Sequence, residues 1–265
     1  MERAIILLLF FSHLSFADNT VNITYKGSGT NITTKQVGEN NISYVLCGAG
    51  SSGSVPGTTY VAHTCTNATL TSNLDGTGNS SRIYTVWSNH IGNSYTINID
   101  GNDNFAYIDH DEDDNTSSIT QIGNNNHAEQ LGTGNDNVYT INQTGNSKYA
   151  KILAFGDNAD ATITQYGTGS HNAYIYNDNY ADNNSATVIQ YGSGNKDADI
   201  FFYADADNSD VDLTQYGTGA HTANMKFYTD DYTVNVTQLG ATNQSYTATF
   251  NCTLDCTKTI TITQQ

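Results

Sequence analysis

Short runs along the chain alternate apolar and polar residues with a period of two. In each run the aliphatic residues share one face with a closing glutamine, while Thr, Asn or Asp occupies the other face. Examples are ATITQ at 161–165, VDLTQ at 211–215, VNVTQ at 234–238 and ITITQ at 260–264. Alternation of this kind predicts half-buried β-strands.

The closing glutamine recurs at a regular interval. From Gln121 the successive spacings are 22, 22, 25, 25, 23 and 26 residues, which brings the series to Gln264. Steps of 22 and then 25 residues back from Gln121 reach Ile99 and Leu74, where the glycine of the Gln-x-Gly motif is kept and the glutamine is not. The glutamines of the series are Gln36, Gln121, Gln143, Gln165, Gln190, Gln215, Gln238 and Gln264. We call each position of this series a slot, whether or not it holds glutamine. The turn glycines assigned to the slots are Gly38, Gly101, Gly123, Gly145, Gly167, Gly192, Gly217 and Gly240.

This period predicts a stacked repeat. The glycine supplies the positive φ that a chain reversal needs, and a second strand-like run with a small residue such as Ala128 follows it. Each repeat of 22–26 residues is then strand–turn–strand–turn. Two strands cannot bury a face alone, but stacked copies can. We predict an all-β, two-sided β-solenoid of about ten rungs. Its glutamines form a buried hydrogen-bonded ladder, and Tyr166, Tyr191 and Tyr216 stack on its outer face.

Composition and charge narrow the function classes. The chain has 265 residues, with 9 Lys+Arg against 26 Asp+Glu and a formal net charge of −17. Nucleic-acid binding requires a basic face, so no nucleic-acid partner is expected. The histidines are scattered, and no Ser/His/Asp set, HExxH motif or phosphate loop is present. An enzyme is therefore not expected.

Residues 1–17 are typical of a secretory signal peptide. Arg3 precedes an apolar run at 4–11, and the segment closes on the small residue Ala17. This run is too short to cross a bilayer, so no membrane span is expected. The predicted organisation of the secreted remainder is a leader at 18–30 and a solenoid at 31–265, with a cysteine-bounded insertion at about 45–66.

The four cysteines of an exported chain are candidates for disulfides. Cys47, Cys65, Cys252 and Cys256 allow three pairings. The sequence-local pairing joins Cys47 to Cys65 and Cys252 to Cys256. A zinc site is disfavoured because no CxxC pair occurs.

Acidic residues recur in the turn that follows the second strand, most densely as DHDEDD at 109–114. Stacked carboxylates repel one another, and calcium would relieve that repulsion with oxygen ligands. The alternative is a solvated turn that discourages premature aggregation. Calcium therefore stays open as a ligand, and no other metal or cofactor is predicted.

Four segments resemble the curlin repeat, Q-x-G-x-x-N-x-A. They are QIGNNNHA at 121–128, QYGTGSHNA at 165–173, QYGSGNKDA at 190–198 and QYGTGAHTA at 215–223. Curlins are the subunits of curli, the extracellular amyloid fibres of bacterial biofilms. The resemblance implies a secreted chain that polymerises with itself into fibres for biofilm matrix and cell adhesion. It also implies export through a curli-type outer-membrane pore and a nucleator subunit at the cell surface.

The repeats depart from the curlin pattern in their second strand. Where a second glutamine is usual, this chain has His110, Ala154, Asn177, Phe202 and Phe227. The sequence therefore leaves open whether the chain is the major fibre subunit or the nucleator.

The last run and the outward threonines favour different functions. Residues 259–264 alternate Thr and Ile without an acidic residue, which predicts an exposed strand edge that templates further chains. Outward threonines such as Thr162 and Thr164 instead resemble the ladders of ice-binding β-solenoids. A capped, monomeric solenoid that binds a surface, ice or an adhesion target, is the alternative function.

Overall fold

The structure is a computed structural model of the chain. It describes residues 5–10, 18–48, 64–85, 89–154, 159–176, 184–201, 210–226, 232–249 and 258–265, with only the backbone for 5–10 and Lys258. Most of the predicted signal peptide, Cys252 and Cys256 lie outside the described residues. Every regular element in these ranges is a β-strand, and none of them contains a helix suited in length and apolar character to cross a membrane.

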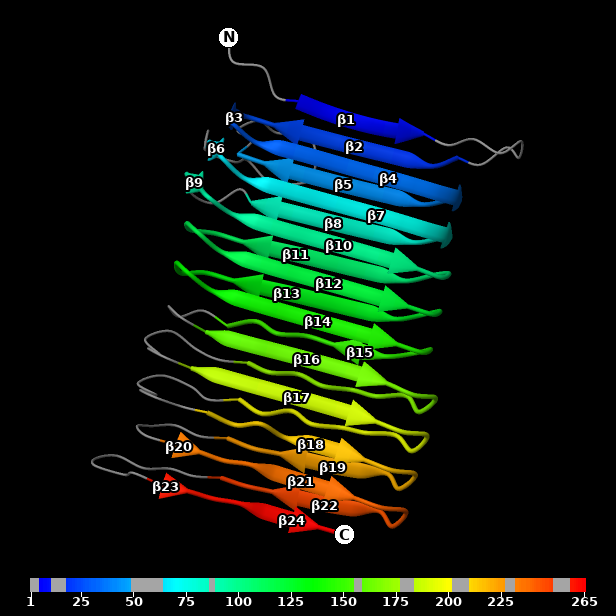
Figure 1. The fold of residues 1–265 in the computed structure, drawn as a ribbon, viewed down its shortest axis with the longest axis vertical. Helices are drawn as coiled ribbons and strands as arrows, with labels where there is room; N and C mark the ends of the chain where they lie inside the picture. Colours follow the sequence, from blue (N-terminus) through cyan, green and yellow to red (C-terminus); the bar gives the residue numbers. More distant parts are fainter. Residues whose placement is uncertain are drawn as a thin grey trace, which may run out of the picture.

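The strands alternate along the chain between two long parallel sheets (Figure 1). The first sheet has eleven strands. In sheet order they are β1 (Ile5–Phe10), β4 (Asn31–Glu39), β7 (Thr69–Thr77), β10 (Ser94–Asp100), β12 (Thr116–Ile122), β14 (Val138–Thr144), β16 (Asp160–Tyr166), β17 (Ser185–Tyr191), β18 (Thr214–Tyr216), β21 (Val236–Leu239) and β24 (Ile262–Gln264).

The second sheet lies on the opposite side of the solenoid and has six strands. They are β2 (Thr20–Tyr25), β5 (Ile42–Cys47), β8 (Ser80–Thr85), β11 (Phe105–His110), β13 (His127–Gly132) and β15 (Tyr149–Ala150). Isolated parallel bridges extend this side from β15 toward the C-terminus. Three small sheets complete the fold: β19 (His221–Asn224) with β22 (Gln244–Thr247), β20 (Tyr232–Thr233) with β23 (Lys258–Thr259), and β3 (Gly27–Ser28) with β6 (Cys65–Thr66) and β9 (His90–Ile91).

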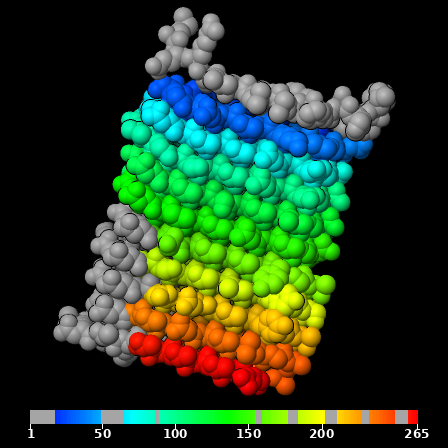
Figure 2. Space-filling model, in the orientation of Figure 1, coloured from blue at the N-terminus to red at the C-terminus, as the bar shows by residue number. Residues whose placement is uncertain are grey.

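The register of the first sheet confirms the predicted repeat. Gln36 pairs with Leu74, Leu74 with Ile99, and Ile99 with Gln121, so the two slots without glutamine fall in line with the others. The remaining glutamines follow in the same register down to Gln264. The protein is therefore a two-sided β-solenoid, and its rungs appear as successive bands in the space-filling view (Figure 2).

The core is a set of columns, one inward position per rung. From the Ile99 slot onward, the first sheet buries an aliphatic column two residues before each slot, and Ile97, Ile119, Ile141, Ile163 and Val188 are all 0% exposed; Thr34 and Ser72 hold this place in the first two rungs. Burying one such side chain contributes about 1.5–3 kcal/mol. The turns pack as closely as the core: a Cβ on Gly123, where φ is +118°, would lie 2.1 Å from the carbonyl oxygen of Gly145.

Two predicted boundaries are wrong. Residues 18–30 are not a leader, because β2 pairs with β5 and alternates half-buried with exposed residues, so this segment is the first strand of the second sheet. The insertion does not begin at about 45, because Val45 and Leu46 are buried in β5, which runs to Cys47. Residues 49–63, which hold most of the insertion, lie outside the described residues.

Residues 5–10, within the predicted signal peptide, form β1 beside β4. The two strands are parallel, and Phe10 is in register with Gln36. In this chain β1 therefore covers the N-terminal edge of the first sheet, while β24 is the strand at its opposite edge.

Candidate functional site

The amide ladder, Gln121 to Gln264 in the first sheet, runs through the core of the C-terminal rungs. Each glutamine donates from Nε2 to Oε1 of the next, at 2.8, 3.0, 2.8, 3.0, 2.8 and 2.8 Å. Apart from Gln264, these glutamines are 0% exposed. Because the bonds all run in one direction, the ladder is polar, with donors facing the C-terminal end.

Each ladder amide also bridges the two sheets. The other hydrogen of Nε2 is donated to a backbone carbonyl of the second side; for Gln143 this is His127 O at 3.0 Å, and for Gln215 it is Asp197 O at 2.7 Å. Both amide hydrogens and the carbonyl oxygen of an interior ladder residue are thus satisfied, which removes the penalty for a buried polar group.

At the ends of the glutamine series, some amide atoms lack the hydrogen-bond partner that the interior ladder residues have among the described residues. Gln121 and Gln36 are 0% and 3% exposed, yet neither Oε1 has a hydrogen-bond partner among the described residues. Gln121 lacks one because the preceding slot holds Ile99. At the other end Gln264 Nε2 donates to Ser245 O at 3.3 Å, and its second hydrogen has no partner among the described residues.

A second polar column lies at the corner after the turn glycine. We call it the corner column, and its members are Asn41, Asn79, Asn104, Asn126, Lys148, His171, Lys196 and His221. All are at most 1% exposed. In the asparagine rungs Oδ1 accepts the backbone N–H of the next member, as in Asn104 N–H to Asn79 Oδ1 at 3.0 Å. The amide nitrogen donates to a glycine carbonyl of the next rung, as in Asn126 to Gly145 O at 2.8 Å.

The corner column was not predicted as a site, although the sequence contains a signal for it. Its members follow each slot by five residues, or by six in the rungs whose turn is one residue longer, and this is the asparagine place of Q-x-G-x-x-N-x-A. The opposite corner carries a shorter asparagine ladder, in which the N–H groups of Asn115 and Asn137 donate to the preceding Oδ1 at 2.7 and 3.0 Å.

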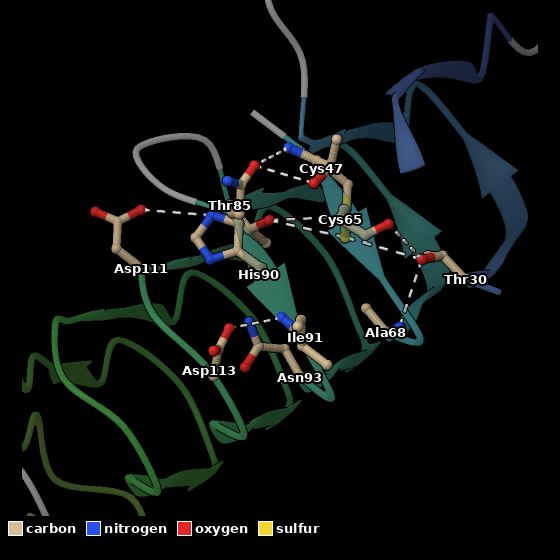
Figure 3. The surroundings of a disulfide bond; sticks show 12 residues. Thr30, Cys47, Cys65, Ala68, Thr85, His90, Ile91, Asn93, Asp111 and Asp113 are labelled. Atoms are coloured by element: carbon tan, nitrogen blue, oxygen red, sulfur yellow. Dashed lines mark hydrogen bonds and ion pairs between the residues drawn. A yellow bond between two sulfur atoms is a disulfide. The ribbon is translucent and has the colours of Figure 1, made fainter. Parts of the chain in front are cut away.

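The N-terminal rungs are held by a disulfide. Cys47 at the end of β5 is bonded to Cys65 in β6, with 5.6 Å between the Cα atoms and 18 residues between the positions. Both cysteines are 0% exposed. Thr30 donates its hydroxyl to Cys65 O at 3.1 Å (Figure 3). His90 donates its backbone N–H to Thr64 O at 2.8 Å. The bond thus anchors the small sheet of β3, β6 and β9 to the second sheet.

The outer face of the first sheet carries two regular columns. The rings of Tyr166, Tyr191 and Tyr216 lie one above another, tilted by 37° and 30°, with centroid separations of 4.4 and 4.9 Å. Three residues before each slot lies a hydroxyl column that is continuous over seven strands. Its members are Thr33, Thr71, Thr96, Ser118, Thr140, Thr162 and Thr187. Asp212 and Asn235 occupy the same place in the later rungs.

The acidic run 109–114, which begins in the last two residues of β11 and continues into the turn after it, is the best described of the acidic segments. Asp109 is 8% exposed and accepts the Tyr107 hydroxyl at 2.5 Å, and burial raises the pKa of its carboxyl to about 6. Asp113 accepts the backbone N–H of Ile91 at 2.7 Å. No group of three metal-binding side chains occurs within the described residues. Of the other acidic turns, Asp157, Asp178, Asp182, Asp205, Asp207, Asp230 and Asp231 lie outside those residues.

One serine–histidine contact occurs in the described core. Ser117 Oγ lies 2.8 Å from His110 Nε2, and these residues are 1% and 0% exposed. Burial, with a smaller contribution from His90, lowers the pKa of His110 to about 3. The pair lies between Tyr95 and Tyr139 inside the solenoid rather than in a cleft.

Comparison with known proteins matches the repeat. The family model described as curlin associated repeat matches residues 134–167 and 181–217. These segments contain β14, β16, β17 and the ladder residues Gln143, Gln165, Gln190 and Gln215. The match confirms the predicted resemblance there. A search of curated proteins finds no match.

Proposed function

We propose that this chain, which carries curlin associated repeats, is a secreted structural subunit that assembles end to end with copies of itself into an extracellular fibre. The fibre contributes to biofilm matrix and cell adhesion. Support comes from the family of the repeat and from the two ends of the solenoid, which complement each other in strand order and in hydrogen bonding.

Strand order allows one copy to continue another. Without residues 1–17, the described solenoid begins at β2 in the second sheet and ends at β24 in the first. A second copy placed below β24 therefore adds its β2 under β22 and then its β4 under β24. The alternation of the two sides continues across the junction without a missing or repeated strand, which is the condition for an open, head-to-tail polymer.

The amide ends carry the proposal. Among the described residues, one amide hydrogen of Gln264 at the C-terminal end has no partner, and neither has Gln36 Oε1 at the N-terminal end, even while β1 covers β4. In the stacked dimer the Gln264 amide donates to Gln36 just as Gln238 donates to Gln264 within one chain. A buried polar atom without a partner costs about 1–3 kcal/mol, so this bond favours docking in a single register.

Removal of residues 1–17 on export would couple secretion to assembly. While β1 covers β4, the N-terminal edge of the first sheet is already paired. Once β1 is removed, β4 presents unpaired backbone groups, which are a template for another strand. The resemblance adds a curli-type export pore and a nucleator subunit as partners of this process.

The experiment compares residues 18–265 with the full chain, each diluted from denaturant to neutral pH. We expect residues 18–265 to form fibres after a lag that added seed shortens, followed by amyloid-dye fluorescence and electron microscopy. The full chain is expected to elongate seeds much more slowly. A Gln36→Leu variant should weaken elongation, while Lys35→Thr, an outward change on the same strand, should not.

A seeded sample of residues 18–265 that stays monomeric for days would overturn the fibre proposal. Spontaneous fibres at low concentration that also seed a second curlin would place the chain as nucleator, whereas growth only from added seed would place it as the major subunit.

The hydroxyl column on the outer face of the first sheet, from Thr33 to Thr187, supports a second candidate function, which is surface binding by a monomer. Thermal hysteresis from the full chain, without fibres, would favour that function.

A further inference from the structure

The C-terminal half of the corner column replaces asparagine with alternating basic residues. Lys148, His171, Lys196 and His221 stack one rung apart, and all are at most 1% exposed. The amide of an asparagine stays neutral between pH 4 and 7.5, whereas lysine and histidine side chains bind and release protons. The substitution therefore introduces a proton-dependent element into an otherwise uncharged ladder.

The lysines are bound by backbone carbonyls. Lys148 Nζ donates to Gly167 O at 2.9 Å and to Gly169 O at 2.5 Å. Lys196 Nζ donates to Gly194 O and Gly217 O at 3.1 Å each, and also to Gly219 O. An ammonium group carries three donors and no acceptor, so these oxygens suit the charged form. Burial lowers the pKa of Lys148 to about 8 and also lowers that of Lys196, so at neutral and acid pH each lysine holds a positive charge at the corner.

The histidines between them are built for the neutral form. His171 Nε2 lies 3.1 Å from Tyr166 O, and His221 Nε2 lies 3.0 Å from Tyr216 O. A carbonyl only accepts, so Nε2 carries the proton in both rings. Nδ1 of each ring is buried and has no hydrogen-bond partner among the described residues. Protonation of Nδ1 would add a buried donor without an acceptor, which is costly.

The charges around the histidines oppose protonation as well. Lys148 and Lys196 flank His171, and burial together with these charges lowers the pKa of His171 to about 4. Burial and Lys196 lower the pKa of His221. Below His221 the column meets the neutral Gln244. Asp197, next to Lys196 in sequence, has its Oδ2 3.4 Å from Asn172 Nδ2 instead of a bond to either ring.

We propose that Lys148, His171, Lys196 and His221 form an acid-sensitive lock, which holds the C-terminal rungs together while the histidines are neutral and opens them when the histidines take up protons. The direction of the pH effect on stability follows from the difference between the histidine pKa values of the folded and unfolded chain. The unfolded histidines bind protons near pH 6.5 and the folded His171 only near pH 4. Stability of these rungs therefore falls as pH drops from about 6.5 to 4. This lock is independent of fibre assembly.

The experiment measures hydrogen exchange of the full chain by mass spectrometry between pH 7.5 and 4, corrected for intrinsic rates. In the wild type, peptides within 160–226 should show an opening constant that rises by tens of fold from pH 7 to 4.5, the rise expected for one histidine with its pKa lowered to about 4. In H171N/H221N, which restores the asparagine of the earlier rungs, the rise should be at most about threefold.

Two further variants test the cause. His127→Asn changes a histidine on the outer face, 39% exposed, and should keep the wild-type acid response within 160–226. K148N/K196N removes the flanking charges but not the burial, so its response should lie between those of the wild type and H171N/H221N. An H171N/H221N protein that opens with acid as the wild type does would overturn the lock.

A measurement on the unmutated chain guards against a variant that fails to fold. Imidazole NMR titration of the full chain should give a pKa of about 4 for His171 and a lowered pKa for His221, with the Nε2-H tautomer of both rings at neutral pH. Ordinary values near 6.5 for both rings would overturn the proposal whatever the variants do. Because both readouts use unassembled protein, failure of the lock and failure of the fibre proposal are distinguishable.

Discussion

The N-terminal and C-terminal rungs solve the same packing problem with different chemistry. From β4 to β10 the slots hold Gln36, Leu74 and Ile99, and the turns are held by a disulfide and by the small sheet of β3, β6 and β9. From β12 to β24 every slot holds glutamine, and the ladder is continuous. The first region is anchored by covalent and aliphatic contacts, and the second by a periodic amide network that another copy can extend.

The two kinds of slot differ in what they contribute: aliphatic slots stabilise a single chain, whereas the ends of a glutamine ladder also favour binding of another copy. A hydrophobic slot is satisfied within one chain and does not specify what lies on the next rung. A ladder glutamine leaves one donor or acceptor open wherever the series stops, so its end has a chemical preference for another amide. The comparison predicts that damage to the two regions has different size, location and pH dependence.

The largest effect is expected from breaking the ladder at its centre. Gln190→Leu leaves the Gln165 amide hydrogen and the Gln215 Oε1 buried without partners. At about 1–3 kcal/mol for each orphaned group, we expect a loss of about 4 kcal/mol in the free energy of unfolding, measured by denaturant titration. The matched change Ile99→Gln pairs Gln121 Oε1, but it leaves its own Oε1 unpaired against Leu74 and removes a buried aliphatic side chain, so it should cost about 2 kcal/mol, half the loss of Gln190→Leu. Equal losses would contradict the distinction between the regions.

Removal of the disulfide tests the other region. C47S/C65S opens a loop closed across 18 residues, and the chain-entropy estimate for such a loop is about 3 kcal/mol. Hydrogen exchange should locate the loss in β5, β6 and β9 and leave β16 to β21 protected as in the wild type. Loss of protection along the whole solenoid would show that the two regions unfold as one unit.

A smaller effect concerns the pH dependence of the N-terminal rungs. Burial raises the pKa of Asp109 to about 6, against a smaller lowering by the Tyr107 hydroxyl. The folded carboxyl keeps its proton up to about pH 6 while the unfolded one releases it near 3.8, so stability falls as pH rises through this window. The change is at most about 3 kcal/mol, spread over this pH window.

Asp109→Asn isolates this contribution. The difference in unfolding free energy between wild type and variant should change between pH 4 and 6.5 and be flat above it. The sign is opposite to that of the histidines in the corner column. A difference that stays constant across this range would mean that Asp109 is ionised in the folded protein throughout.

Much of the fold was predictable because individual residues, glutamine and the glycine two positions after it, mark each repeat in the sequence. The glycines after Leu74 and Ile99 marked two slots without glutamine, and both strands lie in the predicted register. The segment 18–30 was missed because β2 has no Gln-x-Gly motif, and its signal is only the alternation of Val21, Ile23 and Tyr25 with polar residues. Such a short pattern becomes a strand once β5 provides its partner.

The corner column could be predicted only in part. The recurrence of His171 and His221 at one turn register was visible in the sequence. The burial of Lys148 and Lys196 was not, because lysine is normally exposed and here depends on carbonyls contributed by the next rung. The choice among three disulfide pairings likewise required the distance between β5 and β6, which no spacing encodes.

The smallest predicted effect sharpens the comparison at the surface. Tyr191 stacks between Tyr166 and Tyr216 on the outer face of the C-terminal rungs, whereas the same column holds Asp75 and Asp100 in the N-terminal rungs. Tyr191→Thr, which copies Thr144 of the same column, removes both ring contacts, and we expect a loss of about 1 kcal/mol in unfolding free energy. Ile122→Thr is the control, because Ile122 is 46% exposed and lies between Asp100 and Thr144. A Tyr191→Thr loss no larger than that of the control would show that the tyrosine stack adds nothing to the amide ladder beneath it.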